Sequence, residues 1–198
     1  MKVPSRFLWA FGPLLALACN KSEPAPLASS TAAPSSTAAP SSPISNVPSG
    51  LVGVGAVAPA IDAVAHTGEH ITLAGLQGKP VVVYFYPKDD TPGCTKEACE
   101  IRDAWEKLQE TGAVVLGIST DDAQSHIAFA SKYKLPFKLI PDPAGAIAEA
   151  YGVPVRMGYT KRVTFIVDRH GKIAKVFPDV NPAGHAAEIL GALSGLTT

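Results

Sequence analysis

The stretch YFYPKDDTPGCTKEAC, residues 84–99, carries the strongest signal in the chain. It starts at the end of an apolar run, turns through Pro87 and Pro92, and enters a helical pattern whose first turn holds Cys94. A cysteine at that point lies near unpaired backbone N–H groups and the positive end of the helix dipole. Both favour thiolate over thiol. We therefore expect a reactive sulfur here.

The residues around this stretch predict alternating strands and helices. Residues 81–86 and 113–119 are continuous apolar runs typical of buried strands, and a helical pattern from about 94 to 110 separates them. Such a strand, helix, strand unit implies parallel pairing. The later expectations are a helix over 123–133, a strand over 137–140, a helix over 143–151, an antiparallel hairpin of 162–168 with 172–177, and a helix over 183–193. The predicted fold class is α/β, a thioredoxin-like mixed sheet flanked by helices.

Composition limits the number of domains and the kinds of partner that the protein can have. With 198 residues, 46% of them hydrophobic, the chain can bury one ordinary core, so one folded domain is expected, at 51–198. Lys and Arg total 17, as do Asp and Glu, so no excess of positive charge points to nucleic acid or an anionic membrane surface.

The N-terminus resembles a lipoprotein-type signal peptide. Lys2 and Arg6 precede an uncharged, mostly apolar run over 7–18, which is shorter than the roughly 20 residues of a spanning helix. The sequence LALAC at 15–19 resembles the lipobox of bacterial lipoproteins, although Ala16 stands where many have a large aliphatic residue. We expect a signal at 1–18, cleavage before Cys19 and lipidation of that cysteine. An ordinary cleaved signal with a chance cysteine stays the alternative.

Residues 19–50 are the predicted tether. Ala, Pro, Ser and Thr dominate 21–50, and the hexamer STAAPS occurs at 30–35 and again at 36–41, so no core can form there. A flexible chain of this length spans on the order of 30 Å. We expect an exported domain, lipid-anchored to a bacterial membrane and facing the periplasm. Asn20, which is not Asp, favours the outer membrane.

Cys94 and Cys99 occupy different faces of the predicted helix. A core-facing stripe with helical spacing comprises Ala98, Ile101, Trp105 and Leu108, and Cys94 extends it. Cys99 lies about 140° around the axis, with its Cα about 8.6 Å from that of Cys94. Disulfides usually join Cα atoms within about 7 Å, so a bond between these sulfurs requires the first helical turns to unwind.

This stretch resembles the active site of peroxiredoxins, specifically the peroxiredoxin Q or bacterioferritin comigratory protein group. Pro87, Thr91 and Cys94 match the signature Pro-x-x-x-Thr-x-x-Cys, and Cys99 stands at the resolving position used by many members. The resemblance covers essentially all of 51–198. It implies a thiol-dependent peroxidase that reduces hydrogen peroxide and organic hydroperoxides.

The resemblance also implies a role for each residue. Cys94 would be peroxidatic and form a sulfenic acid, which Cys99 would trap as an intramolecular disulfide that a thiol then reduces. Thr91 would place its hydroxyl against the sulfur and the peroxide. Pro87 would shape the turn and shield the thiolate from water.

An arginine from a later strand completes the family's site. Arg162, at the start of RVTFIVD (162–168), matches its position and would supply a permanent positive charge beside Cys94. Arg102 and Arg156 are weaker candidates. We expect no cofactor and no metal site, because two cysteines supply too few soft ligands and the five histidines lack ligand spacing. These histidines are expected on the surface or in turns.

The remaining residues near the motif are interpreted as structural. Asp89 and Asp90 are expected to accept backbone N–H groups ahead of the helix, and Asp121 and Asp122 to cap the helix over 123–133. Trp105 is expected to pack in the core.

The expected partners are a peroxide and a periplasmic thioredoxin-like or other thiol reductant, and the resemblance favours a monomer. An exported thioredoxin-like thiol–disulfide oxidoreductase is the alternative function. Such enzymes use Cys-x-x-Cys, whereas four residues separate Cys94 from Cys99. A third possibility is a non-enzymatic lipoprotein domain in which the two cysteines form a structural disulfide.

Overall fold

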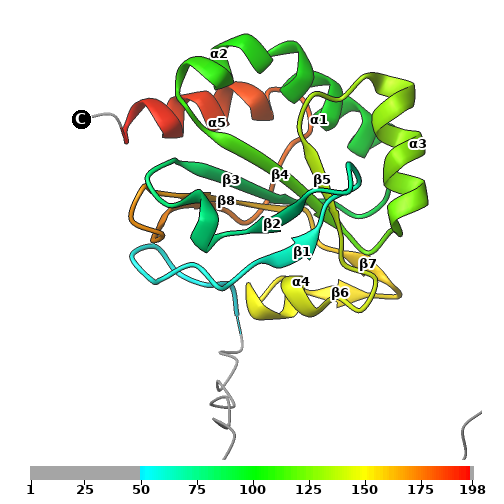
Figure 1. The fold of residues 1–198 in the computed structure, drawn as a ribbon, viewed down its shortest axis with the longest axis horizontal. Helices are drawn as coiled ribbons and strands as arrows, with labels where there is room; N and C mark the ends of the chain where they lie inside the picture. Colours follow the sequence, from blue (N-terminus) through cyan, green and yellow to red (C-terminus); the bar gives the residue numbers. More distant parts are fainter. Residues whose placement is uncertain (1–49, 197–198) are drawn as a thin grey trace, which may run out of the picture. The chain divides into compact units, whose positions relative to one another are not determined.

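The computed structural model describes residues 50–196, and a five-stranded mixed sheet runs through their centre (Figure 1). Strands β3 (Val81–Phe85), β4 (Val114–Ser119) and β5 (Lys138–Pro141) are parallel to one another. Strand β8 (Val163–Val167) pairs antiparallel with β3, and β9 (Ile173–Phe177) pairs antiparallel with β8. The order β5-β4-β3-β8-β9 puts β3 in the middle. The predicted parallel unit and closing hairpin are confirmed.

Helices and small hairpins surround this sheet. The helices of the described part are α1 (Pro92–Asp103), α2 (Trp105–Glu110), α3 (Ala123–Tyr133), α4 (Ala146–Ala150) and α5 (His185–Ser194). The smaller elements are β1 (Asp62–Val64), β2 (His70–Thr72), the 3-10 turn η1 (Ala74–Leu76), β6 (Val155–Arg156) and β7 (Tyr159–Thr160). No helix within residues 50–196 is long and apolar enough to span a membrane. The predicted signal at 1–18, Cys19 and the tether up to residue 49 lie outside the described residues.

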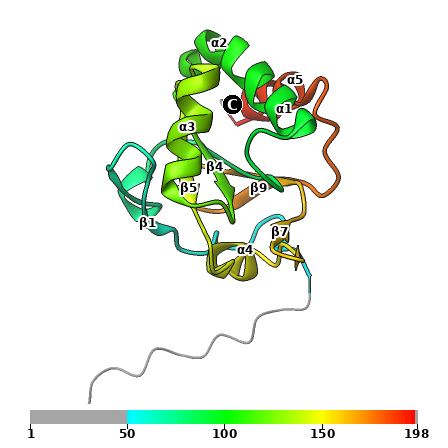
Figure 2. The same cartoon turned by 90° about the vertical axis from the view of Figure 1, so that its right-hand side faces the viewer.

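Two hydrophobic cores lie on the two faces of the sheet. All of β3 is buried, and its successive side chains alternate between the cores, as the strand geometry requires. Val83 and Phe85 join one core with Ala148 of α4, whereas Val82 and Tyr84 join the other. Helices α1, α2, α3 and α5 cover the second face, while α4 and β6–β7 lie on the opposite side (Figures 1 and 2). The site described below lies on the face with the four helices.

The helix predicted over 94–110 is two helices in the structure. α1 begins at Pro92, because proline fits a first helical turn, where its missing N–H costs no bond. Ala104, with φ −91° and ψ 7°, leaves α-helical geometry, so α1 ends at Asp103 and α2 begins at Trp105. Trp105, predicted to pack in the core, is partly buried and lies against the core, with its ring centroid 6.0 Å from that of Phe137.

The residue that precedes each of α3 and α4 determines where the helix begins. α3 runs over the predicted residues, and Asp122 is its N-cap, since the Ser125 N–H donates to its carboxylate at 2.8 Å. Asp121 is not a cap, contrary to expectation, and accepts the backbone N–H of Asp89 instead. α4 begins three residues later than predicted, because Gly145 adopts a left-handed φ of 70° before it.

Gly117 in β4 offers a test of the packing. A Cβ at this position would lie 2.6 Å from the ring of Tyr84 and 2.8 Å from the side chain of Leu139. Gly117→Ala is therefore expected to lower the free energy of unfolding by about 1–3 kcal/mol, measured by urea denaturation. Gly191→Ala is the control, because its Cβ meets nothing within 4 Å and alanine favours helix α5 by about 0.5–1 kcal/mol. Equal effects of the two substitutions would contradict this packing.

Candidate active site

Cys94 lies in the first turn of α1, where the chain has just left β3. Thr91 is the N-cap, and Cys94 is the third helical residue. The Thr95 N–H is bonded to the Thr91 carbonyl, so the N–H groups of Gly93 and Cys94 precede the first intrahelical bond. Cys94 is 3% exposed, as expected from the apolar stripe. The sulfur is therefore sheltered and close to the positive end of the helix.

The guanidinium of Arg162 contacts this sulfur, with Nη2 3.1 Å from Sγ of Cys94. Arg162 directly precedes β8, whose first residue, Val163, pairs with Phe85 at the end of β3. The register of the sheet thus brings Arg162 to the point from which the chain enters α1. Burial opposes the positive charge, but Glu97 and Cys94 outweigh it and raise the pKa of Arg162. The sulfur has a permanent cation beside it.

Glu97 is a site residue that the sequence analysis missed. It is fully buried, and its carboxylate forms an ion pair with Nη1 of Arg162. The Oε1 atom has no hydrogen-bond partner among the described residues. Burial raises the pKa of Glu97 to about 7, and Arg162 partly offsets this rise. Glutamate on a helix usually faces solvent, but the spacing of three residues from Cys94, on the same helical face, was an available signal.

The other two candidate arginines lie elsewhere. The Arg102 Nε donates to Asp103 at 2.8 Å. That hydrogen bond, with a smaller contribution from Cys99, raises the pKa of Arg102. Arg156 is exposed on β6. Of the three arginines, Arg162 is the one that contacts the buried sulfur.

Cys99 lies on the same uninterrupted helix as Cys94 and is partly exposed. Both thiols are free. Because α1 is continuous from Pro92 to Asp103, the Cα separation of about 8.6 Å for an unbroken helix applies. A bond between the two sulfurs therefore requires α1 to open between residues 94 and 99.

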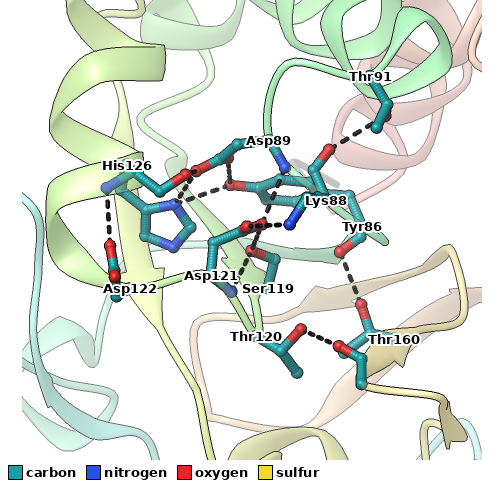
Figure 3. Close-up of polar contacts among 12 residues, drawn as sticks. Tyr86, Lys88, Asp89, Thr91, Ser119, Thr120, Asp121, Asp122, His126 and Thr160 are labelled. Carbon is teal, nitrogen blue, oxygen red and sulfur yellow. Dashed lines mark hydrogen bonds and ion pairs between the residues drawn. The ribbon is translucent and has the colours of Figure 1, made fainter.

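The turn between β3 and α1 contains the two other predicted site residues. The Thr91 hydroxyl donates to the carbonyl of Lys88 at 3.1 Å and closes the turn (Figure 3). Its contact with the sulfur and the peroxide stays a prediction. Pro87 lines an open pocket of about 630 Å³ together with residues of the β6–β7 hairpin. The turn is therefore accessible to a small molecule from that side.

Asp89 and Asp90 attach this turn to α3, and the expectation that they bind backbone N–H groups was wrong. Asp89 is buried, and its carboxylate accepts three side-chain hydrogen bonds. The donors are the hydroxyl of Tyr86 and Nδ1 of His126 (Figure 3) and the hydroxyl of Ser125, each at 2.8 Å. Asp90 binds Lys132 and the hydroxyl of Tyr133, at 2.6 Å each. Most of these donors come from a helix more than 30 residues further along the chain, which local sequence does not reveal.

Two histidines contradict the expectation of surface or turn positions. His126 and His185 are fully buried, and neighbouring oxygens bind Nδ1 of His126 and both ring nitrogens of His185. His126 bonds Asp89, while His185 bonds Thr164 and Glu188 at 2.8 and 2.9 Å. Within residues 50–196, no group of three or more His, Cys, Asp or Glu could hold a metal ion.

This arrangement supports nucleophilic chemistry at Cys94. The thiolate is the reactive form of cysteine, and a nearby cation and a helix N-terminus both favour it. When the sulfur attacks an electrophile, the guanidinium of Arg162, 3.1 Å away, can stabilise negative charge that develops on the departing atom.

Comparisons with known proteins agree with this chemistry. The model of the AhpC/TSA family matches residues 54–176. A putative peroxiredoxin bcp of Coxiella burnetii is 47% identical over 149 residues, which cover 72% of this chain and 99% of that protein. The chloroplastic peroxiredoxin Q of Suaeda salsa is 43% identical over 148 residues, 73% of this chain and 69% of that protein.

Solved structures share the same architecture. The peroxidoxin BcpB of Mycobacterium tuberculosis superposes with a TM-score of 0.69 at 32% identity, covering 73% of this chain and 98% of that one. Peroxiredoxin Q of Xanthomonas campestris gives a TM-score of 0.66 at 30% identity, covering 70% and 92%. The thioredoxin-like fold predicted from the sequence is confirmed.

The buried carboxylate of Glu97 makes stability depend on pH. Its pKa is about 7 in the folded protein, against 4.5 for an ordinary glutamate. The folded state holds this proton more tightly than the unfolded chain, so Glu97 lowers stability as the pH rises from about 4.5 to about 7. We expect Glu97→Gln to remove about 3 kcal/mol of this pH dependence. Urea unfolding of both proteins across that range measures it, and parallel stability curves would contradict the raised pKa.

Proposed function

The chain belongs to the AhpC/TSA family, in its bacterioferritin comigratory protein and peroxiredoxin Q group, and we propose that it reduces hydrogen peroxide and organic hydroperoxides through a Cys94–Cys99 disulfide cycle. As a peroxiredoxin, the protein is a thiol-dependent peroxidase.

The 3.1 Å contact between Nη2 of Arg162 and the buried sulfur of Cys94 carries the proposal. The thiolate attacks the terminal peroxide oxygen, an S–O bond forms while the O–O bond breaks, and water or an alcohol leaves after taking up a proton. The sulfur is oxidised to a sulfenic acid and the peroxide is reduced. Arg162 stabilises charge on the departing oxygen. Thr91 orients the peroxide, and Pro87 keeps water from the sulfur.

Cys99 completes the cycle. Its sulfur attacks Sγ of the sulfenic acid, an S–S bond forms, and the hydroxyl group leaves as water after protonation. Because a regular α1 holds the two Cα atoms about 8.6 Å apart, the helix opens before the bond forms and closes again after reduction. The dithiol of a thioredoxin-like protein supplies the electrons for that reduction.

We also place this chemistry outside the cytoplasm. The basis is the sequence of residues 1–50, with its signal at 1–18, Cys19 as the lipidated residue and the polar tether. A domain anchored in this way, acting as a monomer, draws electrons from a periplasmic thioredoxin-like protein. Disulfide exchange with client proteins is disfavoured, because Cys94 and Cys99 cannot meet without opening α1.

Arg162→Gln is expected to slow the oxidation of Cys94 by hydrogen peroxide by about a hundredfold or more, because the cation beside the sulfur is lost. Stopped-flow tryptophan fluorescence gives the second-order rate constant. The double variant Arg162→Gln with Glu97→Gln accompanies it, because the single change leaves a buried carboxylate unpaired. Arg169→Gln is the charge-matched control and keeps the wild-type rate. A larger loss in Arg102→Gln or Arg156→Gln would overturn the assignment.

Cys99→Ser is expected to keep the rate of the first oxidation and to lose the disulfide, because only the second sulfur is removed. Excess peroxide then carries Cys94 from sulfenic to sulfinic acid, which mass spectrometry detects. Cys94→Ser is the matched variant and shows no rapid oxidation. If instead Cys99→Ser lost the first step and Cys94→Ser kept it, the two roles would be reversed.

A further inference from the structure

The β3–α1 turn contains a buried carboxylate that the peroxidase cycle does not use. The side chain of Asp89 is 4% exposed. Its Oδ1 accepts the hydroxyl of Tyr86, and its Oδ2 accepts the hydroxyl of Ser125 and Nδ1 of His126, each at 2.8 Å. Its backbone N–H donates to Asp121 at 2.8 Å. Asp89 is thus bonded to the end of β3, to the loop after β4 and to α3 (Figure 3).

Among the partners of Asp89, His126 is the one that core packing does not explain. An ionised carboxylate only accepts hydrogen bonds, so Nδ1 of His126 carries the hydrogen and donates it to Asp89. The imidazole is fully buried, and its Nε2 has no partner among the described residues. An apolar side chain of similar size would avoid that unpaired atom. The histidine is therefore explained by its bond to Asp89 and not by packing.

Asp89 is ionised in this setting. Burial by itself raises the pKa of Asp89, but the hydrogen bond and positive potential of His126, together with the hydroxyls of Ser125 and Tyr86, outweigh it and hold the pKa below its ordinary value. Ser125, His126 and Asp89 do not form a hydrolytic triad. The Ser125 hydroxyl donates to the carboxylate and not to the imidazole, and both Asp89 and His126 are buried.

We propose that Asp89 and His126 are a positioning pair for Cys94, which fixes the β3–α1 turn on α3 and so holds the sulfur against Arg162. This inference rests on the proposed role of Cys94. Asp90, next in the turn, has a φ of 57°, which residues other than glycine rarely adopt, so the turn keeps this shape through its anchors. α1 starts two residues later, so a shift of the turn moves the sulfur. A misplacement of about 1 Å can cost about a hundredfold in rate.

The test compares two replacements of His126 in the full-length protein. His126→Leu has similar size and no donor, whereas the amide of His126→Asn can donate near the position of Nδ1. We expect His126→Leu to slow the bimolecular oxidation of Cys94 by hydrogen peroxide by about tenfold to a hundredfold. We expect His126→Asn to recover most of that loss. The later, peroxide-independent step of disulfide formation is not slowed, because it requires the turn and α1 to loosen.

Two further variants separate positioning from stability. Asp122→Ala removes the N-cap of the same helix, so it lowers the melting temperature and leaves the oxidation rate unchanged. Ser125→Ala removes one of the three donors to Asp89, and its rate falls between those of the wild type and His126→Leu. It also supplies the comparison if His126→Leu does not fold.

The outcomes distinguish the two proposals. If wild-type thiols react no faster than free cysteine, the proposed peroxidase cycle at Cys94 fails. If the wild type is fast and both His126→Leu and Ser125→Ala match it while folded, the positioning pair fails. Equal slowing by His126→Leu and His126→Asn would also overturn it, because the rate would then not depend on the donor.

Discussion

One guanidinium balances the charges at the point where the chain passes from β3 into α1. Arg162 contacts the sulfur of Cys94 and the carboxylate of Glu97, and both partners are buried on α1. Buried charges are costly unless they are paired. If Arg162 turned away from either partner, that partner would be left buried without a counter-charge, which would cost free energy of folding. The antiparallel pairing of β8 with β3 and the start of α1 at Pro92 keep these three groups together. A cation beside a sulfur favours the thiolate, so the proposed reaction relies on this arrangement.

The same end of the molecule holds polar atoms that lack partners. Among the described residues, these buried side-chain atoms are Tyr84 Oη, Thr95 Oγ1, Glu97 Oε1 and His126 Nε2. Each such group costs about 1–3 kcal/mol. Thr95 and Glu97 lie between Cys94 and Cys99, in the segment of α1 that has to open for a disulfide. Opening that segment exposes both groups to water, which offsets part of the cost of breaking the helix.

The elements of the fold could be predicted because hydrophobic periodicity is local. The apolar runs of β3 and β4, the β8–β9 hairpin and α3 with its cap at Asp122 all follow from residues within a few positions of one another. Errors arose where the backbone of one residue decides a boundary. Ala104 divides the predicted helix in two, and the left-handed Gly145 delays α4. Alanine is common within helices and glycine within loops, so the residue types at these two positions do not reveal the boundaries.

Local sequence patterns alone indicate a sheltered cysteine in the first turn of a helix and a second cysteine on another face of that helix. Those conclusions need only the period of the helix and the turn before it. The family resemblance indicates Arg162 as the cation near that sulfur, but its pairing with Glu97 and the bond of His126 to Asp89 follow from the tertiary structure, because these contacts join residues far apart in the chain. Arg162 is 68 residues from Cys94, and His126 is 37 from Asp89. The spacing of three residues from Cys94 places Glu97 on the same face of the helix. The strand register decides whether a cation lies beside its carboxylate.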